Sequence, residues 1–229
     1  MNYMVVDLWA VYPYIVILLF FGVPVFRYKT NRFSIHSPST ELLEKKVQEP
    51  FSFIWHYGLI IVFLGHVLGL LVPVWLMNEL GIPFATHYLL AVYIGGISGV
   101  ATLAGLLGLT YRRFANKRVR ATTTWDHYVV YALLIAVFVA GLFNTLGYQL
   151  FIRPYNYDAT IGAWLQGVLT LRPDAALMAQ APVSFQIHVF LAMTFLAVFP
   201  FTFLIHMWTG IFNSISYIFR PRIIYRSRR

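Results

Sequence analysis

Four histidines lie in long uncharged stretches of this sequence, where polar side chains are rare. They are His56, His66, His188 and His206. A polar group inside an apolar segment long enough to cross a membrane is costly and usually functional. One such histidine would equally suit a packing role. Two histidines on each of two segments instead indicate a metal or haem site, because an imidazole nitrogen can bind haem iron axially.

The charged residues divide the chain into five apolar spans that could carry these histidines. Only 11% of the 229 residues are charged, whereas a soluble domain has about 25%. A membrane crossing takes about 20 apolar residues. We therefore predict an all-α integral membrane bundle of five transmembrane helices, forming a single domain over residues 1–229. The spans are expected near residues 7–27, 52–77, 86–111, 126–150 and 184–212.

The basic residues predict the orientation of this bundle. The chain has 17 Lys and Arg against 8 Asp and Glu, a formal charge of +9. Only Arg153 and Arg172 fall on one side of the predicted bundle, which leaves 15 of the 17 on the other side. The positive-inside rule then places the N-terminus outside and the C-terminus in the cytoplasm. Lipid head groups and orientation explain the basic excess, so we expect no nucleic-acid partner.

Topology pairs the four histidines in one way. The second and fifth spans run in opposite directions, so His56 pairs with His206 near the cytoplasm and His66 with His188 toward the outside. Each pair could supply two axial nitrogens to a haem iron, which gives two haems stacked across the membrane. Zinc or copper fits less well, because four imidazoles at these separations do not converge on one ion. A proton relay is also possible, but no intramembrane carboxylate lies nearby.

Helix geometry sets a problem for this pairing. The 18 residues from His188 to His206 rise roughly 27 Å, whereas the 10 residues from His56 to His66 rise roughly 15 Å. A bend at Pro200, like one expected at Pro73, must absorb part of the difference.

Further local signals predict smaller features. We expect a short helix near residues 159–170 on the outer surface, with Trp164 at the membrane–water interface. His36, His87 and His127 lie near span ends, where an interfacial role is the default. The glycines of the second and third spans would allow either close helix packing, which is favoured for each alone, or approach of a flat macrocycle. These glycines are Gly58, Gly65, Gly69, Gly95, Gly96 and Gly99.

Several short motifs resemble one known family over nearly the whole chain. They are Tyr12-Pro13-Tyr14-Ile15, Phe26-Arg27-Tyr28, residues 39–45 (STELLEK), residues 56–66 (HYGLIIVFLGH), Gly95-Gly96-Ile97-Ser98-Gly99, residues 118–124 (RVRATTT), His188, Phe199-Pro200-Phe201 and Leu204-Ile205-His206. The sequence resembles the gamma subunit of respiratory nitrate reductase, which is the membrane cytochrome b of a three-subunit complex.

This resemblance implies a specific function. It implies two haem b groups, with His66 and His188 as ligands of the outer haem iron, and His56 and His206 as ligands of the inner haem iron. Quinol is the expected substrate, oxidised near the outer haem. Electrons would pass to a cytoplasmic iron–sulfur subunit and then to a molybdenum catalytic subunit, where nitrate is reduced. The location implied is the cytoplasmic (inner) membrane of a bacterium or archaeon. The absence of cysteine agrees, because clusters must then reside in a partner.

Three further residues are candidates for the site. His87 opens the third span on the outer side and could accept a proton from quinol; the alternative is a plain interfacial histidine. Arg112 and Arg118 could pair with the inner-haem propionates, or act as topology determinants or partner contacts. The basic tail, residues 220–229, could dock a cytoplasmic partner or bind lipid. The alternatives for the whole chain are an equivalent subunit of a related nitrite- or sulfur-compound oxidoreductase, or a haem-free membrane anchor.

Overall fold

The computed structural model describes residues 7–31, 35, 40–208 and 210–212. Within these residues every regular element is helical, and five segments are long and apolar enough to cross a membrane. The all-α, five-span prediction is therefore confirmed, whereas the orientation of the termini stays a prediction. The five segments are Asp7–Asn31, Gln48–Leu71, Phe84–Ala115, Trp125–Ile152 and Val183–Phe201. His36 and the basic tail, residues 220–229, lie outside the described residues.

The first four segments consist of α-helix joined to π-helical turns, and the fifth is an α-helix followed by a 3-10 turn. The α-helical parts are α2 (Tyr12–Ile17), α3 (Val23–Asn31), α4 (Gln48–His66), α6 (Phe84–Leu90), α7 (Gly96–Ala115), α9 (Trp125–Leu142) and α12 (Val183–Val198). The π-helical parts are η1 (Asp7–Val11), η2 (Leu18–Gly22), η4 (Val67–Leu71), η5 (Ala91–Gly95) and η6 (Phe143–Ile152). Short elements between the spans are α5 (Val74–Glu79), α8 (Lys117–Arg120), the π-helical η7 (Asp158–Gly162), α10 (Ala163–Leu169) and α11 (Ala175–Gln180). Two 3-10 turns, η8 (Phe199–Phe201) and η9 (Phe203–Ile205), follow α12.

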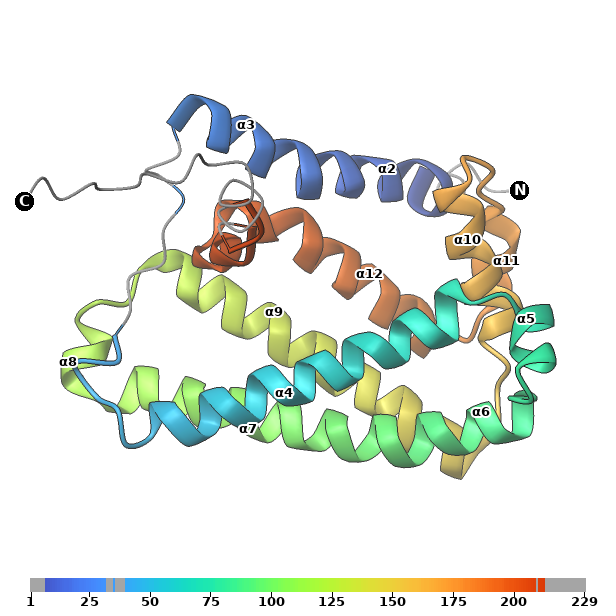
Figure 1. Cartoon of the computed structure of the whole chain (residues 1–229), viewed down its shortest axis with the longest axis horizontal. Helices are drawn as coiled ribbons and strands as arrows, with labels where there is room; N and C mark the ends of the chain where they lie inside the picture. The colour runs from blue at the N-terminus through green and yellow to red at the C-terminus, as the bar shows by residue number, and fades with distance from the viewer. Residues whose placement is uncertain (1–6, 32–34, 36–39, 209, 213–229) are drawn as a thin grey trace, which may run out of the picture.

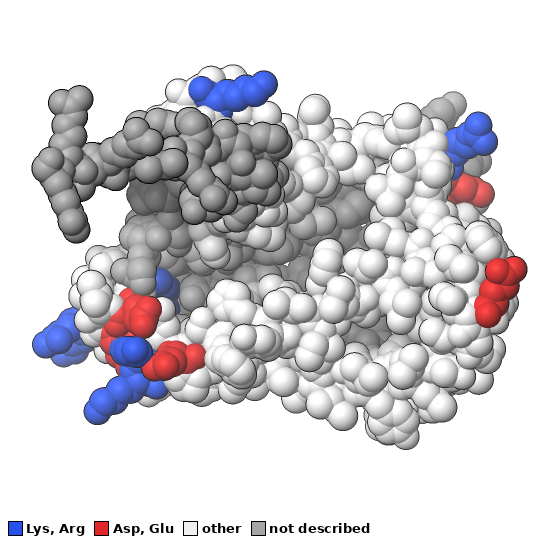
Figure 2. Space-filling view, in the orientation of Figure 1, with Lys and Arg blue, Asp and Glu red and all other residues white. Residues whose placement is uncertain are grey.

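The spans form a bundle in which α4 packs on α7, α7 and α12 pack on α9, and α2 packs on α12 (Figure 1). The end of α3, α8 and the start of α9 share one end, called the basic end below; α5, α6, α10 and α11 share the opposite end. Figure 2 shows the charged side chains gathered at these two ends, with an uncharged surface between them. This band is what a lipid bilayer requires of a spanning protein.

Small residues bring α4 and α7 together. A Cβ atom on Gly105 would lie 2.7 Å from the backbone nitrogen of Trp55, and one on Gly58 would collide with Thr102. Close packing, the favoured explanation for such glycines, is therefore confirmed at Gly58. Gly65 has no atom within 4 Å of a Cβ position, so that position faces open space. Between α4, α7 and α9 lies an apolar core of Trp55, Leu106, Val130, Leu134 and Phe138.

The opposite end is closed by the predicted short helix, which spans η7 and α10. Its Trp164 is only 2% exposed, so the ring packs inside the protein and does not face lipid or water; its depth in the membrane stays a prediction. The indole packs edge-to-face on Trp9, and its Nε1–H donates to the Trp9 carbonyl oxygen at 2.8 Å. A buried indole needs such an acceptor, and Trp9 supplies one from the first span.

Pro73 and Pro200 are associated with interruptions of the second and fifth spans, whereas the sequence predicted only bends. The second span ends at Leu71, earlier than the predicted residue 77, because Val72 before Pro73 is extended (ψ 121°) and α5 starts afresh. In the fifth span Pro200 lies in the 3-10 turn η8, and the interruption falls at Thr202, which is extended (φ −115°, ψ 174°). The Thr202 side chain accepts from the Leu204 N–H and so caps η9. The single span predicted to residue 212 is therefore two segments.

Candidate functional site

The rings of His66 and His188 lie next to each other between the second and fifth spans. Their ring centroids are 6.2 Å apart, with an angle of 37° between the ring planes. A metal ion holds each imidazole nitrogen at about 2.0 Å, which puts the centres of two opposed ligand rings roughly 6 Å apart. The separation in the structure thus fits two axial imidazoles on one iron.

All four intramembrane histidines have the same ring nitrogen bonded in the same way. In each, Nδ1 lies within hydrogen-bond distance of a backbone carbonyl oxygen. The acceptors are Ser52 for His56 (2.7 Å), Val62 for His66 (2.7 Å), Val137 for His188 (3.1 Å) and Phe203 for His206 (2.9 Å). A carbonyl has no proton to give, so Nδ1 carries the hydrogen and Nε2 keeps its lone pair. Metal-binding histidines need this tautomer, with the nitrogen away from the metal donating its hydrogen to a fixed acceptor.

His127 provides a contrast within the same chain. Its Nδ1 lies within hydrogen-bond distance of the Thr124 backbone N–H (3.3 Å) and hydroxyl (2.7 Å), and no backbone carbonyl is its partner. Thr124 is the N-cap of α9, and His127 completes a capping box with it. His127, which the sequence placed at a span end, therefore has a local structural role. Among the described histidines, the contact between Nδ1 and a backbone carbonyl is specific to the other four.

A glycine on α9 makes room for His188. A Cβ atom on Gly141 would lie 2.8 Å from Cε1 of His188 and 3.3 Å from its Nδ1. The ring can therefore approach α9 closely enough to bond the Val137 carbonyl, which lies one turn before Gly141. The sequence analysis missed Gly141, because one more glycine in an apolar span carries no signal of its own.

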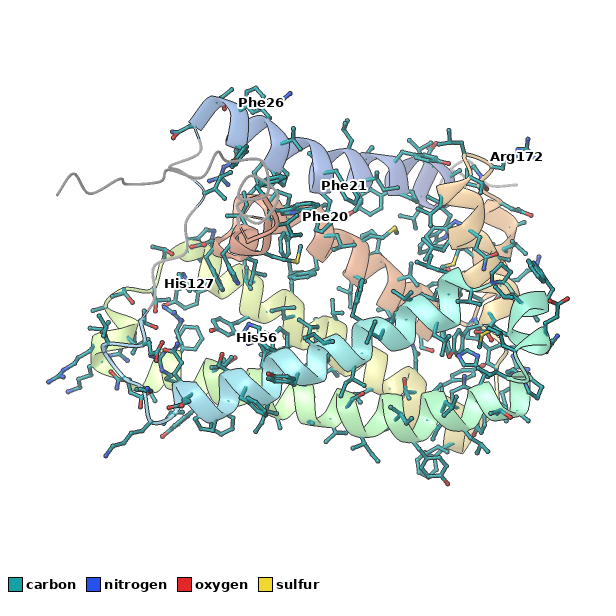
Figure 3. All side chains as sticks on the ribbon, viewed as in Figure 1. Phe20, Phe21, Phe26, His56, His127 and Arg172 are labelled. Carbon is teal, nitrogen blue, oxygen red and sulfur yellow. The ribbon has the colours of Figure 1, made fainter. Side chains whose placement is uncertain are left out.

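The inner pair, His56 and His206, is arranged differently. Both side chains are exposed, and among the described residues these two rings make no contact with each other. His56 points from α4 toward the space between α4 and α9 (Figure 3). His206 follows the interruption at Thr202, where the chain turns, so that the last helical segment is seen end-on in Figure 1. His206 therefore does not lie on a straight extension of α12, which removes part of the predicted mismatch in rise.

The start of α9 holds the segment that carries His206. The Asp126 carboxylate accepts from the Phe203 backbone N–H at 3.0 Å. The ring of Phe203 stacks on His127, with centroids 4.4 Å apart and planes 16° from parallel. These contacts fix the chain three residues before His206 at the basic end of the bundle.

His87 is buried at the opposite end and belongs to a polar cluster. It is 5% exposed, and its Nδ1 lies 2.6 Å from the Asp158 carboxylate. Its Nε2 faces the Tyr157 hydroxyl at 3.4 Å and lies 3.0 Å from the Cβ position of Gly69, one helical turn beyond His66. An interfacial position for His87 is wrong, since the ring is enclosed. Burial raises the pKa of Tyr157, so its hydroxyl stays protonated and can donate to Nε2.

Asp158 is the residue at this end that sequence reasoning missed. It was counted only as an outer charge, although it is the one acidic residue between Arg153 and Arg172. Because a carboxylate accepts from Nδ1–H of His87, it leaves Nε2 as the basic nitrogen. The pair has the orientation that general-base histidines use.

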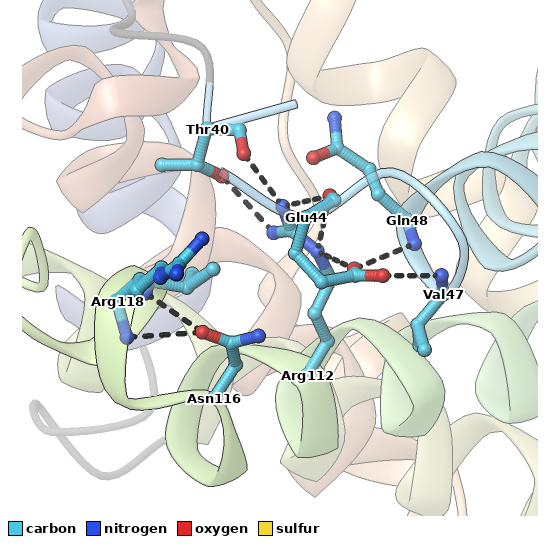
Figure 4. Close-up of polar contacts among 8 residues, drawn as sticks. Thr40, Glu44, Val47, Gln48, Arg112, Asn116 and Arg118 are labelled. Atoms are coloured by element: carbon cyan, nitrogen blue, oxygen red, sulfur yellow. Dashed lines mark hydrogen bonds and ion pairs between the residues drawn. The ribbon is translucent and has the colours of Figure 1, made fainter. Parts of the chain in front are cut away.

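Arg112 and Arg118 are placed at the basic end (Figure 4). The buried guanidinium of Arg112 donates to the Glu44 carboxylate (2.7 Å), to Thr40 Oγ1 (3.0 Å) and to the backbone carbonyls of both residues. Its three nitrogens thus fix the loop before α4. Hydrogen bonds from the Val47 N–H and from Arg112 hold the pKa of Glu44 below its usual range. Arg118 has an exposed side chain, and its backbone N–H donates to Asn116.

Residues 6–228 match the sequence model of the nitrate reductase gamma subunit family. The nitrate reductase gamma chain of Bacillus subtilis is 34% identical over 221 residues, which cover 96% of this chain and 97% of that one. The respiratory nitrate reductase 2 gamma chain of Escherichia coli is 33% identical and covers 100% of this chain and 99% of its own. The nitrate reductase-like protein NarX of Mycobacterium tuberculosis is 37% identical over 96% of this chain, which spans only 33% of that longer relative.

Proposed function

This chain belongs to the nitrate reductase gamma subunit family, and we propose that it is the di-haem, quinol-oxidising membrane subunit of a respiratory nitrate reductase. As a family member it is a membrane subunit of an oxidoreductase. The finer assignment comprises two haem b groups, quinol as substrate, and electron delivery to a cytoplasmic iron–sulfur subunit and a molybdenum catalytic subunit. The proposed location is the cytoplasmic membrane of a bacterium or archaeon, with the basic end facing the cytoplasm.

The tautomer shared by His56, His66, His188 and His206 carries this proposal. Each ring presents an unprotonated Nε2, and the 6.2 Å separation of the His66 and His188 rings suits an iron between them. We assign His66 and His188 to an outer haem and His56 and His206 to an inner haem. When bound, the two haems would supply one-electron transfer along the bundle. The open space beside Gly65 supports the outer assignment, because it adjoins His66.

The quinol is proposed to bind between His66 and His87. Gly69 lies one turn from His66 and against Nε2 of His87, so His87 is next to the outer pair. A quinol hydroxyl could replace Tyr157 as the donor to Nε2, and Asp158 would stabilise the imidazolium that forms on proton transfer. The loop between η6 and η7, which is exposed at Arg153 and Pro154, then offers the proton a route to the outer surface. His87 is thus the proposed proton acceptor and Asp158 its positioning partner.

A reduced-minus-oxidised visible spectrum of the purified chain tests the proposal. We expect b-type absorption and two haems per chain. A His66→Leu variant should lose one haem, and so should a His56→Leu variant, because each removes one axial ligand of a different pair. A Tyr93→Leu variant removes an exposed ring of η5 that belongs to neither pair, so it should keep both haems and is the control. A wild-type chain with no b-type absorption, or with fewer than two haems, would contradict the assignment.

A further inference from the structure

A second arginine at the basic end, Arg113, is buried with two of its three side-chain nitrogens unpartnered. It is only 8% exposed, and its Nε and Nη1 have no hydrogen-bond partner in the part of the chain that the structure describes. A buried guanidinium is costly unless its charge and its donors are matched. The adjacent Arg112 has its donors satisfied by Thr40 and Glu44, so the two arginines differ sharply.

The position of Arg113 on α7 directs it into the bundle. Gly99, Leu106 and Arg113 follow one another at seven-residue intervals, which returns a helix to nearly the same face. Gly99 packs on Leu142 of α9, and Leu106 is 1% exposed in the core between α4, α7 and α9. Arg113 therefore lies on the face of α7 that packs against α9, and not on the face directed toward lipid.

The neighbours of Arg113 belong to the inner histidine region. The next residue, Phe114, packs on Tyr128, which follows His127 in α9, and the His127 ring stacks on Phe203 three residues before His206. His127 and His56 both lie toward the basic end in Figure 3. Arg113 thus faces the same interior region as the inner pair, from a different helix.

The chain's own nearby carboxylates are already bonded. Glu44 accepts from Arg112 and from the Val47 N–H, and Asp126 accepts from Thr124 and from the Phe203 N–H. A guanidinium presents two parallel N–H groups that match a carboxylate oxygen pair. Within the described residues no carboxylate pairs with Arg113, although its guanidinium is suited to bind one.

We propose that Arg113 binds a propionate carboxylate of the inner haem, in place of the Arg112 contact expected from the sequence. This inference rests on the proposed function, since it requires a haem between His56 and His206. Arg113 is a positioning residue in this role, because it holds the periphery of the cofactor and touches no substrate. Its positive charge also favours the added electron on the nearby iron, so it should raise the reduction potential of the inner haem.

The test is a redox titration of the purified complex with Arg113→Gln, Arg113→Lys and Arg120→Gln. The inner haem is first identified as the component lost in His56→Leu. We expect Arg113→Gln to weaken reduction of the inner haem about tenfold, a downward shift of about 59 mV for a one-electron couple, or to release that haem alone. The lysine variant should recover part of the shift. Arg120→Gln removes the same charge from an exposed side chain of α8 and should change neither haem.

Two results would overturn the inference while leaving the proposed function intact. One is an Arg113→Gln protein with both haems bound and an unchanged inner potential. The other is an equal loss or equal shift of both haems, which would assign Arg113 to bundle stability. A lipid or partner-protein carboxylate as the true ligand would give the first result. Failure of the proposed function is distinguishable, because the wild-type chain would then hold no haem pair to titrate.

Discussion

Gly141→Ala is a small change that should remove the outer haem selectively. The added methyl would lie 2.8 Å from Cε1 of His188, whereas ordinary contacts begin at 3.4 Å, so the ring must move by 3.4 − 2.8 = 0.6 Å. Moving that far from α9 lengthens the 3.1 Å contact with the Val137 carbonyl to as much as about 3.7 Å, beyond hydrogen-bond range.

The cost of this displacement can be worked out from its parts. One lost hydrogen bond costs about 1 kcal/mol, and overpacking costs about 1–3 kcal/mol. A total of about 2–4 kcal/mol weakens outer-haem binding roughly 30-fold to several hundred-fold, at 1.4 kcal/mol per tenfold. Alanine has a better helix propensity than glycine, which should stabilise the folded bundle by up to about 1 kcal/mol. The bundle itself should therefore stay intact.

Haem content per chain and the reduced-minus-oxidised spectrum measure the outcome. We expect Gly141→Ala to fall from two haems toward one, with the remaining haem matching that of His66→Leu. Gly95→Ala is the matched control, because no atom lies within 4 Å of its Cβ position. Two haems with unaltered potentials in Gly141→Ala would refute the role assigned to the His188–Val137 contact.

Three more outcomes follow from other contacts. Asp158→Asn should lower the turnover of quinol oxidation about 100-fold while both haem spectra stay normal, since His87 loses the acceptor that fixes its tautomer; unchanged turnover would exclude the pair from proton transfer. Glu44 has a lowered pKa, so its contribution to loop stability is present above the ordinary glutamate pKa and is lost as pH falls through the lower folded value. Proteolysis at residues 40–47 should therefore accelerate in acid for the wild type, while Glu44→Gln should be cut quickly at every pH. Trp164→Ala should cost about 3–5 kcal/mol of stability, measured as a lower thermal midpoint in detergent, whereas the exposed Trp125→Ala should change it little.

The sequence predicted the spans well, because lipid imposes a requirement that composition reveals directly. Uncharged runs of about 20 residues have few alternatives to a spanning helix. The positions of the interruptions within the spans were harder to predict, since they depend on which residue near a proline adopts a non-helical conformation. Val72 extends before Pro73, and Thr202 extends two residues after Pro200, where its side chain can cap the next turn. Neither position follows from the proline alone.

The candidate site was predicted only in part: the pairing of the histidines followed from the sequence, but their hydrogen-bond partners did not. Antiparallel topology was enough to pair His66 with His188, and the structure brings these rings together. The hydrogen-bond partners were not predictable, because they depend on contacts between spans: Asp158 meets His87 across 71 residues, and Glu44 meets Arg112 across 68. Arg112 and Arg113 look equivalent in the sequence. One helical step of about 100° sends them to different faces, one to a loop and the other to the interior.

The source of each histidine's tautomer has a consequence for biogenesis. His56, His66 and His206 bond a carbonyl three or four residues earlier in their own segment, so those rings are prepared as soon as each segment forms. His188 instead depends on Val137 of α9, and it becomes competent only after α12 has docked there. The proposed outer haem should therefore be incorporated only after all five segments have inserted. Its incorporation would then indicate that the bundle is fully assembled.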